Sequence, residues 1–157
     1  AQLRNRAMTD NFEPGSTIKT FSMISLLENA EISPEDEIDT APGFYRMGQF
    51  VIKDVRNFGR LSVRNILVKS SKIGLSKLVV ERPSEELLGT FSKFGLGTEM
   101  THVYPGEVQG SLPAPSKHPF TIATHSFGYG LTVTPLQLVH AYATIANKGK
   151  KLPISLL

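Results

Sequence analysis

The 157-residue sequence predicts a mainly α-helical chain, and two observations lead to this fold class. Several segments carry apolar residues at the spacing of a helix face, which indicates four or five helices. Residues of high β-propensity form only short runs, so we expect at most one small hairpin and no strand long enough for the centre of a sheet.

Composition narrows the possible functions. Hydrophobic residues make up 40% of the chain and charged residues 20%, as is usual for a globular domain. The net charge is only +3 and the basic residues are scattered, so we expect no nucleic-acid partner. No run of 18 apolar residues and no signal peptide occurs, so any membrane anchor is expected outside this chain. The absence of cysteine excludes disulfides and thiolate metal sites.

The first helix is expected to begin at or near Ser16, directly after the turn pair Pro14-Gly15. Its apolar residues surround nearly the whole helical wheel, which is typical of a buried helix. They are Ile18, Phe21, Met23, Ile24, Leu26 and Leu27.

Ser16 and Lys19 form a candidate catalytic pair on this helix. They are three residues apart, so one helical turn places both side chains on the same face. A serine at a helix N-terminus suits an oxyanion that forms when its hydroxyl attacks a carbonyl carbon. A lysine buried there should have a depressed pKa, as a general base requires. The alternative is that Ser16 only caps the helix and Lys19 is a surface charge.

The middle of the chain predicts a loop, a hairpin and a second helical element. Residues 29–39 are acidic and contain Ser33-Pro34, so we expect a loop there, followed by a small hairpin within residues 40–54. Over residues 61–80, Ser62 is expected to cap a helix with Val63, Ile66 and Leu67 on its inner face. The polar residues 69–72 interrupt this element and either face solvent or line a cleft.

The last third predicts two helices separated by an irregular connection. Ser84 is expected to cap the first, with Leu87, Leu88 and Phe91 in the core and glycines 95 and 97 at its end. Residues 98–120 are proline-rich and are expected to be irregular. Thr134-Pro135 predicts the start of the final helix, which stops at Gly149. The histidines lack metal-ligand spacing, so we expect neither a metal nor another cofactor; they are His102, His118, His125 and His140.

Several segments together resemble the transpeptidase domain of class B penicillin-binding proteins, and most of all the cell-division enzyme of that class. Residues 5–7, 10 and 12–19 are similar to the family's Ser-x-x-Lys segment, and residues 68–78 to its Ser-x-Asn segment. Residues 94–97, 126–130 and 133–138 resemble further family landmarks in the same order. The resemblance spans nearly the whole chain.

This resemblance implies a peptidoglycan D,D-transpeptidase that is also a β-lactam target. Ser16 corresponds to the acylated nucleophile, Lys19 to its proton acceptor and Ser70 to a proton relay. The implied partners are peptidoglycan stem peptides, β-lactams and division-machinery proteins. The implied location is the periplasm, with an inner-membrane anchor in the parent protein.

Two departures from the family pattern stand out. Lys72 occupies the position of the asparagine in Ser-x-Asn, and we assign it to substrate binding. The family's Lys-Thr/Ser-Gly strand and the strands before the serine helix have no counterpart in these residues. We therefore expect residues 1–157 to be a partial transpeptidase domain, a mainly α fragment of the α/β penicillin-binding protein (serine β-lactamase-like) fold with its central sheet largely absent. The isolated piece is not expected to turn over substrate efficiently.

Two alternative functions remain open at this point. A serine D,D-carboxypeptidase or β-lactamase would use the same Ser-Lys pair on water. A non-catalytic interaction fragment would use only a protein-binding surface.

Overall fold

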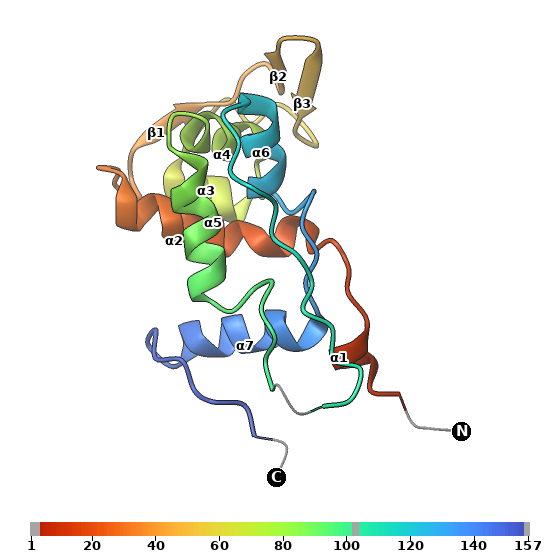
Figure 1. Cartoon of the computed structure of the whole chain (residues 1–157). Helices are drawn as coiled ribbons and strands as arrows, with labels where there is room; N and C mark the ends of the chain where they lie inside the picture. Colours follow the sequence, from red (N-terminus) through yellow and green to blue (C-terminus); the bar gives the residue numbers. More distant parts are fainter. Residues whose placement is uncertain (1–3, 102–103, 156–157) are drawn as a thin grey trace.

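Helices dominate the computed structural model, which describes residues 4–101 and 104–155 (Figure 1). The helical elements are α1 (Arg6–Thr9), the 3-10 helix η1 (Gly15–Ile18), α2 (Lys19–Asn29), α3 (Val63–Val68), α4 (Lys72–Val79), α5 (Ser84–Lys93), α6 (Pro119–Ser126) and α7 (Pro135–Ala146). The strands are β1 (Glu37–Asp39), β2 (Phe44–Met47), β3 (Phe50–Lys53) and β4 (Arg60–Ser62). The prediction of a mainly helical chain is confirmed.

Helix α2 crosses the middle of the molecule, with α4 and α6 on one side and α7 on the other (Figure 1). Its residue Phe21, together with Ile18 of η1, joins a core with α5 and α7. Met23 and Leu26 join a second core with α3 and α4. Burial on two sides explains why apolar residues surround the helical wheel, although Leu27 is 44% exposed and its predicted burial is wrong.

The strands form two separate antiparallel pairs rather than one sheet. The predicted hairpin is confirmed as β2–β3, in which Tyr45 pairs with Ile52. The pair β1–β4 was not predicted, because its strands are three residues long and β1 lies in a segment expected to be a loop. Ile38 and Leu61, which face each other across this pair, pack in the second core.

Three local predictions need correction. Residues 69–71 separate two helices, α3 and α4, and Lys72 is the first residue of α4, so the polar residues do not interrupt a single helix. Ser62 caps α3 as predicted, by accepting a hydrogen bond from the Asn65 amide, but Leu67 is 37% exposed and not on the inner face. Ser84 does not cap α5, because Pro83 is the cap residue and the Ser84 hydroxyl accepts a hydrogen bond from the distant Ser116 amide.

Helix α6 lies partly within the segment predicted to be irregular. Pro119 is its first residue, and Ile122 and Ala123 are buried against the layer that contains α4. The eight residues include Thr121, Thr124 and Ser126, so the apolar periodicity is too short to predict a helix. The start of α7 is confirmed: Thr134 and Gln137 form a capping box in front of it.

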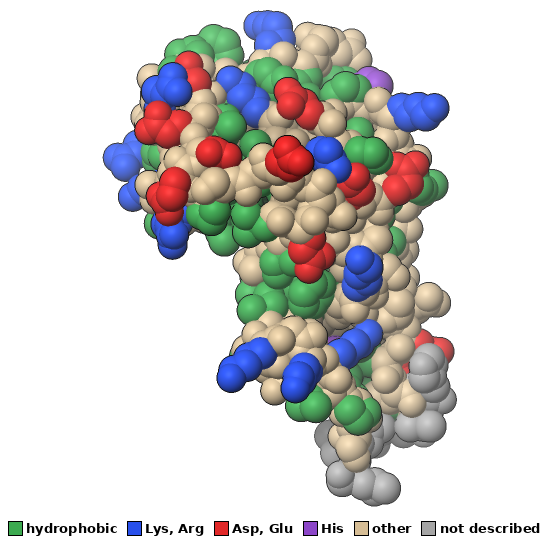
Figure 2. All heavy atoms as spheres, turned by 90° about the vertical axis from the view of Figure 1, so that its left-hand side faces the viewer, with side chains coloured by type: hydrophobic (Ala, Val, Ile, Leu, Met, Phe, Trp, Pro, Cys, Tyr) green, Lys and Arg blue, Asp and Glu red, His purple; other side chains and the backbone are tan. Residues whose placement is uncertain are grey.

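The surface carries charges of both signs. Acidic and basic side chains are interspersed over the upper part of the face shown in Figure 2. None of the helices in residues 4–101 and 104–155 has both the length and the apolar character needed to cross a membrane.

Candidate active site

Ser16 and Lys19 lie on the tight turn that joins η1 to α2. A 3-10 helix has three residues per turn, so side chains three positions apart lie one above the other. The Lys19 amide donates to the Ser16 carbonyl, which holds the two residues in this register. Ser16 is exposed, whereas Lys19 is only 3% exposed. The alternative reading is wrong on both counts, because Pro14 is the cap residue and Lys19 is not a surface charge.

The buried ammonium group of Lys19 contacts Ser70 through two hydrogen bonds. Its Nζ donates to the Ser70 backbone oxygen at 2.6 Å and to the Ser70 Oγ at 3.0 Å. Ser70 has a φ of 55°, in the left-handed region that non-glycine residues rarely adopt. Such strain, of order 1–3 kcal/mol, persists where surrounding contacts hold it, and it is frequent at functional sites. The fold thus brings Ser70 to the lysine of the Ser-x-x-Lys motif from 51 residues away.

The environment of Lys19 weakens its hold on a proton. Burial, and to a lesser extent the nearby positive charge of Lys72, lowers the pKa of Lys19 to about 8 against an opposing effect of Asp54. A pKa of about 8 leaves roughly a tenth of the lysine neutral at pH 7. Lys19 therefore has the protonation behaviour that a general base needs.

Asp54 holds the segment that carries Ser70 and Lys72, and sequence reasoning missed it. Its carboxylate accepts hydrogen bonds from the Ser71 hydroxyl at 2.5 Å, the Lys72 amide at 2.6 Å and the Ile73 amide at 3.2 Å. Asp54 follows β3 by one residue, so the hairpin supplies the anchor for the start of α4. Local spacing gives no signal for this role, because Asp54 and Ser71 are 17 residues apart.

The ammonium group of Lys72 lies over two aromatic rings. Its Nζ lies 5.4 Å from the ring centre of Phe127 and 5.7 Å from that of Tyr129. These distances are typical of cation–π contacts. Lys72, Phe127 and Tyr129 line a cavity of about 390 Å³. The four polar residues 69–72 therefore have different environments. Lys69 and Ser70 are exposed, Ser71 is buried and Lys72 lines this cavity.

The glycine-containing segment 126–130 packs against the loop that begins η1. The Gly15 amide donates to the Gly128 carbonyl at 3.1 Å, and the Gly130 amide donates to the Glu13 carboxylate at 2.8 Å. A Cβ on Gly128 would lie 2.1 Å from the Gly15 carbonyl oxygen, so only glycine fits. The Ser22 hydroxyl fastens the other end by donating to the Ser126 carbonyl at 2.6 Å. This segment therefore positions Ser16.

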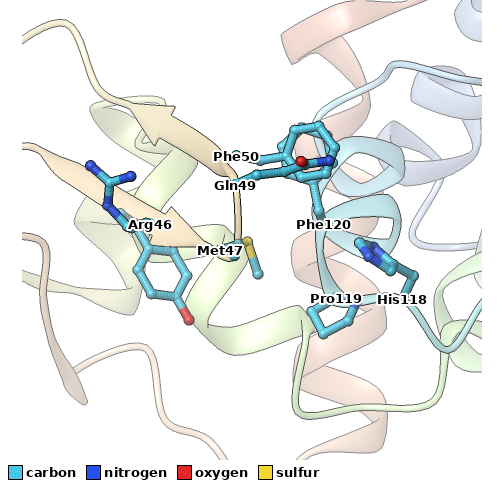
Figure 3. A pocket seen from close by; sticks show the side chains of 9 residues that line it. Arg46, Met47, Gln49, Phe50, His118, Pro119 and Phe120 are labelled. Atoms are coloured by element: carbon cyan, nitrogen blue, oxygen red, sulfur yellow. The ribbon is translucent and has the colours of Figure 1, made fainter.

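A larger cavity of about 530 Å³ lies between the β2–β3 hairpin and the start of α6 (Figure 3). The Phe50 and Phe120 rings stack there with centroids 4.0 Å apart. Phe120 borders both cavities, but Ser16, Lys19, Ser70 and Lys72 do not line the larger one.

Three of the histidines lie in the described structure. His118 borders the larger cavity, whereas His125 and His140 are buried on α6 and α7. His102 lies outside the described residues. Within those residues no group of three or more His, Asp or Glu side chains could hold a metal ion.

The full length of the chain, residues 1–157, matches the family model described as penicillin binding protein transpeptidase domain. The chain therefore belongs to the penicillin-binding protein transpeptidase family, and its resemblance to the class B proteins is confirmed.

Curated relatives support the same family. The chain is 41% identical over 155 residues to "Peptidoglycan D,D-transpeptidase FtsI" of Escherichia coli strain K12, covering 98% of this chain and 26% of that protein. It is 37% identical over 158 residues to "Probable peptidoglycan D,D-transpeptidase PbpC" of Pseudomonas aeruginosa, covering 100% and 28%. The chain thus spans about a quarter of the length of these relatives.

Two solved structures have the same fold. A peptidoglycan glycosyltransferase from Burkholderia ambifaria superposes with a TM-score of 0.93 at 34% identity, over 99% of this chain and 50% of that one. The transpeptidase domain of Burkholderia pseudomallei penicillin-binding protein 3 superposes with a TM-score of 0.89 at 35% identity, over 96% and 46%. The predicted fold class, a mainly α portion of the α/β transpeptidase fold, is confirmed.

Proposed function

We propose that the protein containing this chain is a peptidoglycan D,D-transpeptidase that works through a serine acyl-enzyme. The observation that carries the proposal is the buried Lys19, whose Nζ lies 3.0 Å from the Ser70 Oγ and one turn from the exposed Ser16. The relatives described above are named as a peptidoglycan D,D-transpeptidase and a probable one, which favours the same reaction.

In the proposed reaction Ser16 is the nucleophile, Lys19 is the base and Ser70 relays a proton. The Ser16 Oγ attacks the carbonyl carbon of the D-Ala-D-Ala bond while neutral Lys19 takes the hydroxyl proton. Collapse of the tetrahedral intermediate breaks the peptide bond, and the departing amine receives a proton through Ser70. The amine of a second stem peptide then attacks the Ser16 ester, forms the cross-link and releases Ser16. A β-lactam acylates Ser16 by the same attack on its ring carbonyl.

The same proposal covers the setting of the reaction. We place the protein at the division septum, in the periplasm, with its anchor outside residues 1–157 and with division proteins as partners. Residues 1–157 form one part of the catalytic domain in this proposal, so experiments require the full-length protein.

Labelling with a fluorescent penicillin tests the nucleophile. We expect the full-length protein to be labelled covalently and the Ser16→Ala variant to lose labelling. Ser92→Ala is the matched control, because Ser92 is an exposed serine on α5 and its hydroxyl has no hydrogen bond within the described residues. Labelling of Ser16→Ala at the level of the unmodified protein would show that the assignment is wrong.

The fate of the acyl-enzyme separates the alternatives. A transpeptidase retains the penicilloyl group on its serine, whereas a β-lactamase transfers that group rapidly to water. A D,D-carboxypeptidase transfers a peptide donor to water but not to an added amine acceptor. A protein that is never labelled would support the non-catalytic interaction fragment.

A further inference from the structure

Lys72 differs chemically from the asparagine at the corresponding position of the Ser-x-Asn motif. An asparagine amide both accepts and donates hydrogen bonds, whereas an ammonium group only donates and carries a positive charge. A ligand group that faces Lys72 must therefore be an acceptor. An anion is favoured over a neutral carbonyl because its charge attracts the ammonium group in addition to the hydrogen bond.

The Lys72 ammonium group has no anionic partner in the described residues. No hydrogen bond or ion pair there holds its Nζ, which lies instead over the faces of Phe127 and Tyr129. Phe127 is buried and Tyr129 is half-exposed, and the two rings meet edge to face with their centres 5.9 Å apart, so they form an aromatic wall on one side of the cavity. The aromatic wall keeps the charged group at the cavity.

The carboxylate of Asp54 is held by other donors. Its oxygens accept hydrogen bonds from the Ser71 hydroxyl and from the Lys72 and Ile73 amides. Asp54 therefore fixes the backbone of Lys72, and within the described residues it forms no ion pair with the Lys72 ammonium group.

The cavity beside Lys72 is positively charged and otherwise mostly apolar. Its described lining includes a second cation, Lys53, together with Thr124 and the ring of Phe120, and it contains no acidic residue. Lys19 lies close enough for the Lys72 charge to lower its pKa. Repulsion between the two ammonium groups adds to the preference for a negative ligand group.

We propose that Lys72 makes the acyl-donor side of this site selective for substrates that carry a carboxylate on the part of the donor that enters the Lys72 cavity. The carboxylate lies against Lys72, with Lys53 as the outer cation, and the apolar part of the donor lies on Phe120 and Phe127. The inference rests on the proposed function and adds the charge of the preferred donor.

A matched pair of penicillins tests this selectivity. Benzylpenicillin and α-carboxybenzylpenicillin differ only by a carboxylate on the carbon beside the side-chain amide carbonyl. Second-order acylation rate constants are measured on the full-length protein by competition with a fluorescent penicillin. Their ratio, carboxylated over parent compound, reports carboxylate recognition and cancels general changes in reactivity.

We expect Lys72→Asn to lower this ratio about tenfold, because one charge-assisted contact is lost. Lys72→Arg should keep the ratio within about twofold, since it retains the charge, and Lys53→Gln should lower it only two- to threefold because Lys53 is exposed. Lys69→Gln is the control, as this exposed lysine does not line the cavity.

The outcomes separate the two proposals. An unchanged ratio in Lys72→Asn or in Lys72→Gln, with both penicillins still acylating Ser16, overturns the carboxylate selectivity and leaves the proposed function intact. A loss of the ratio in Lys72→Arg equal to that in Lys72→Asn also overturns it. Failure of both penicillins to acylate the unmodified protein overturns the proposed function, and the selectivity with it.

Discussion

Asp54 and Ser71 are 17 residues apart in the chain, and the Ser71 hydroxyl donates to the Asp54 carboxylate at 2.5 Å. The same carboxylate accepts from the first two amides of α4, so the end of the β2–β3 hairpin is fastened to the segment that presents Ser70 and Lys72. The site depends on this long-range contact, although Asp54 carries no chemistry of its own.

We expect Asp54→Ala to destabilise the protein by roughly 3 kcal/mol, because three hydrogen bonds to a carboxylate are lost. The rate of penicillin acylation should fall by more than the loss of folded protein accounts for, because the segment that presents Ser70 is no longer held by Asp54. Asp54→Asn keeps one acceptor oxygen, so we expect its stability and its acylation rate to lie between those of Asp54→Ala and those of the unmodified protein. Melting temperature and acylation rate of the full-length protein measure both effects.

Glu81→Ala provides the control, because Glu81 is exposed and has no hydrogen bond or ion pair within the described residues. We expect it to change stability by less than about 0.5 kcal/mol. Equal effects of Asp54→Ala and Glu81→Ala would contradict the anchoring role.

Gly128→Ala tests the packing of segment 126–130 against the Ser16 turn. Its Cβ would lie 2.1 Å from the Gly15 carbonyl oxygen and 2.5 Å from the Gly15 amide nitrogen. The loop before Ser16 must then move, so we expect acylation to be reduced at least a hundredfold, since misplacement by about 1 Å can cost that much. Acylation rate and melting temperature are the measurements.

Gly149→Ala separates this clash from backbone strain. Gly149 also has a positive φ, of 80°, but nothing lies within 4 Å of its would-be Cβ. We expect it to cost about 1–2 kcal/mol and to leave the acylation rate of the folded protein unchanged. Comparable loss of acylation in both variants would show that the contact between Gly128 and Gly15 is not what positions Ser16.

The rate of penicillin acylation should rise with pH and level off above a midpoint near the Lys19 pKa of about 8, because the neutral lysine accepts the Ser16 proton. Lys72→Asn removes a positive charge that lowers this pKa, so the midpoint should move up. Asp54→Asn removes a charge that raises it, so the midpoint should move down. Acylation rates between pH 6 and 10 give the profiles.

The lowered pKa of Lys19 also makes the stability of the folded protein depend on pH. The pKa of Lys19 is lower in the folded protein than its ordinary value of 10.5, so the unfolded chain binds more protons between pH 8 and 10.5. Below about pH 8, burying the charged Lys19 costs free energy of folding. This cost becomes smaller as the pH rises toward 10.5 because Lys19 loses its proton in the folded protein first. Lys19→Met should melt higher than the unmodified protein at pH 7, with the difference shrinking as pH rises. A difference in melting temperature that stays constant with pH would contradict this account of Lys19. So would acylation midpoints that stay at the same pH in both Lys72→Asn and Asp54→Asn.

Much of the fold could be predicted because its signals are local. The Pro14-Gly15 turn, the apolar residues of α2 and the Thr134-Pro135 start of α7 each act within a few residues. The elements that were missed, β1–β4 and α6, are short and gain their stability from packing. Ile122 is buried in the same core as α2 residues and Ile38 packs against that core, and periodicity cannot reveal these contacts.

The sequence by itself determined the Ser16–Lys19 pair, since three residues of spacing on a helical turn are enough to align two side chains. It also determined the family, through motifs in a constant order. Only the tertiary structure decided what surrounds the pair: Ser70 at the Lys19 ammonium, Asp54 behind Lys72, and Gly128 against Gly15. These contacts join residues 18 to 113 positions apart. They depend on how α2, α4 and segment 126–130 pack together, which no local pattern specifies.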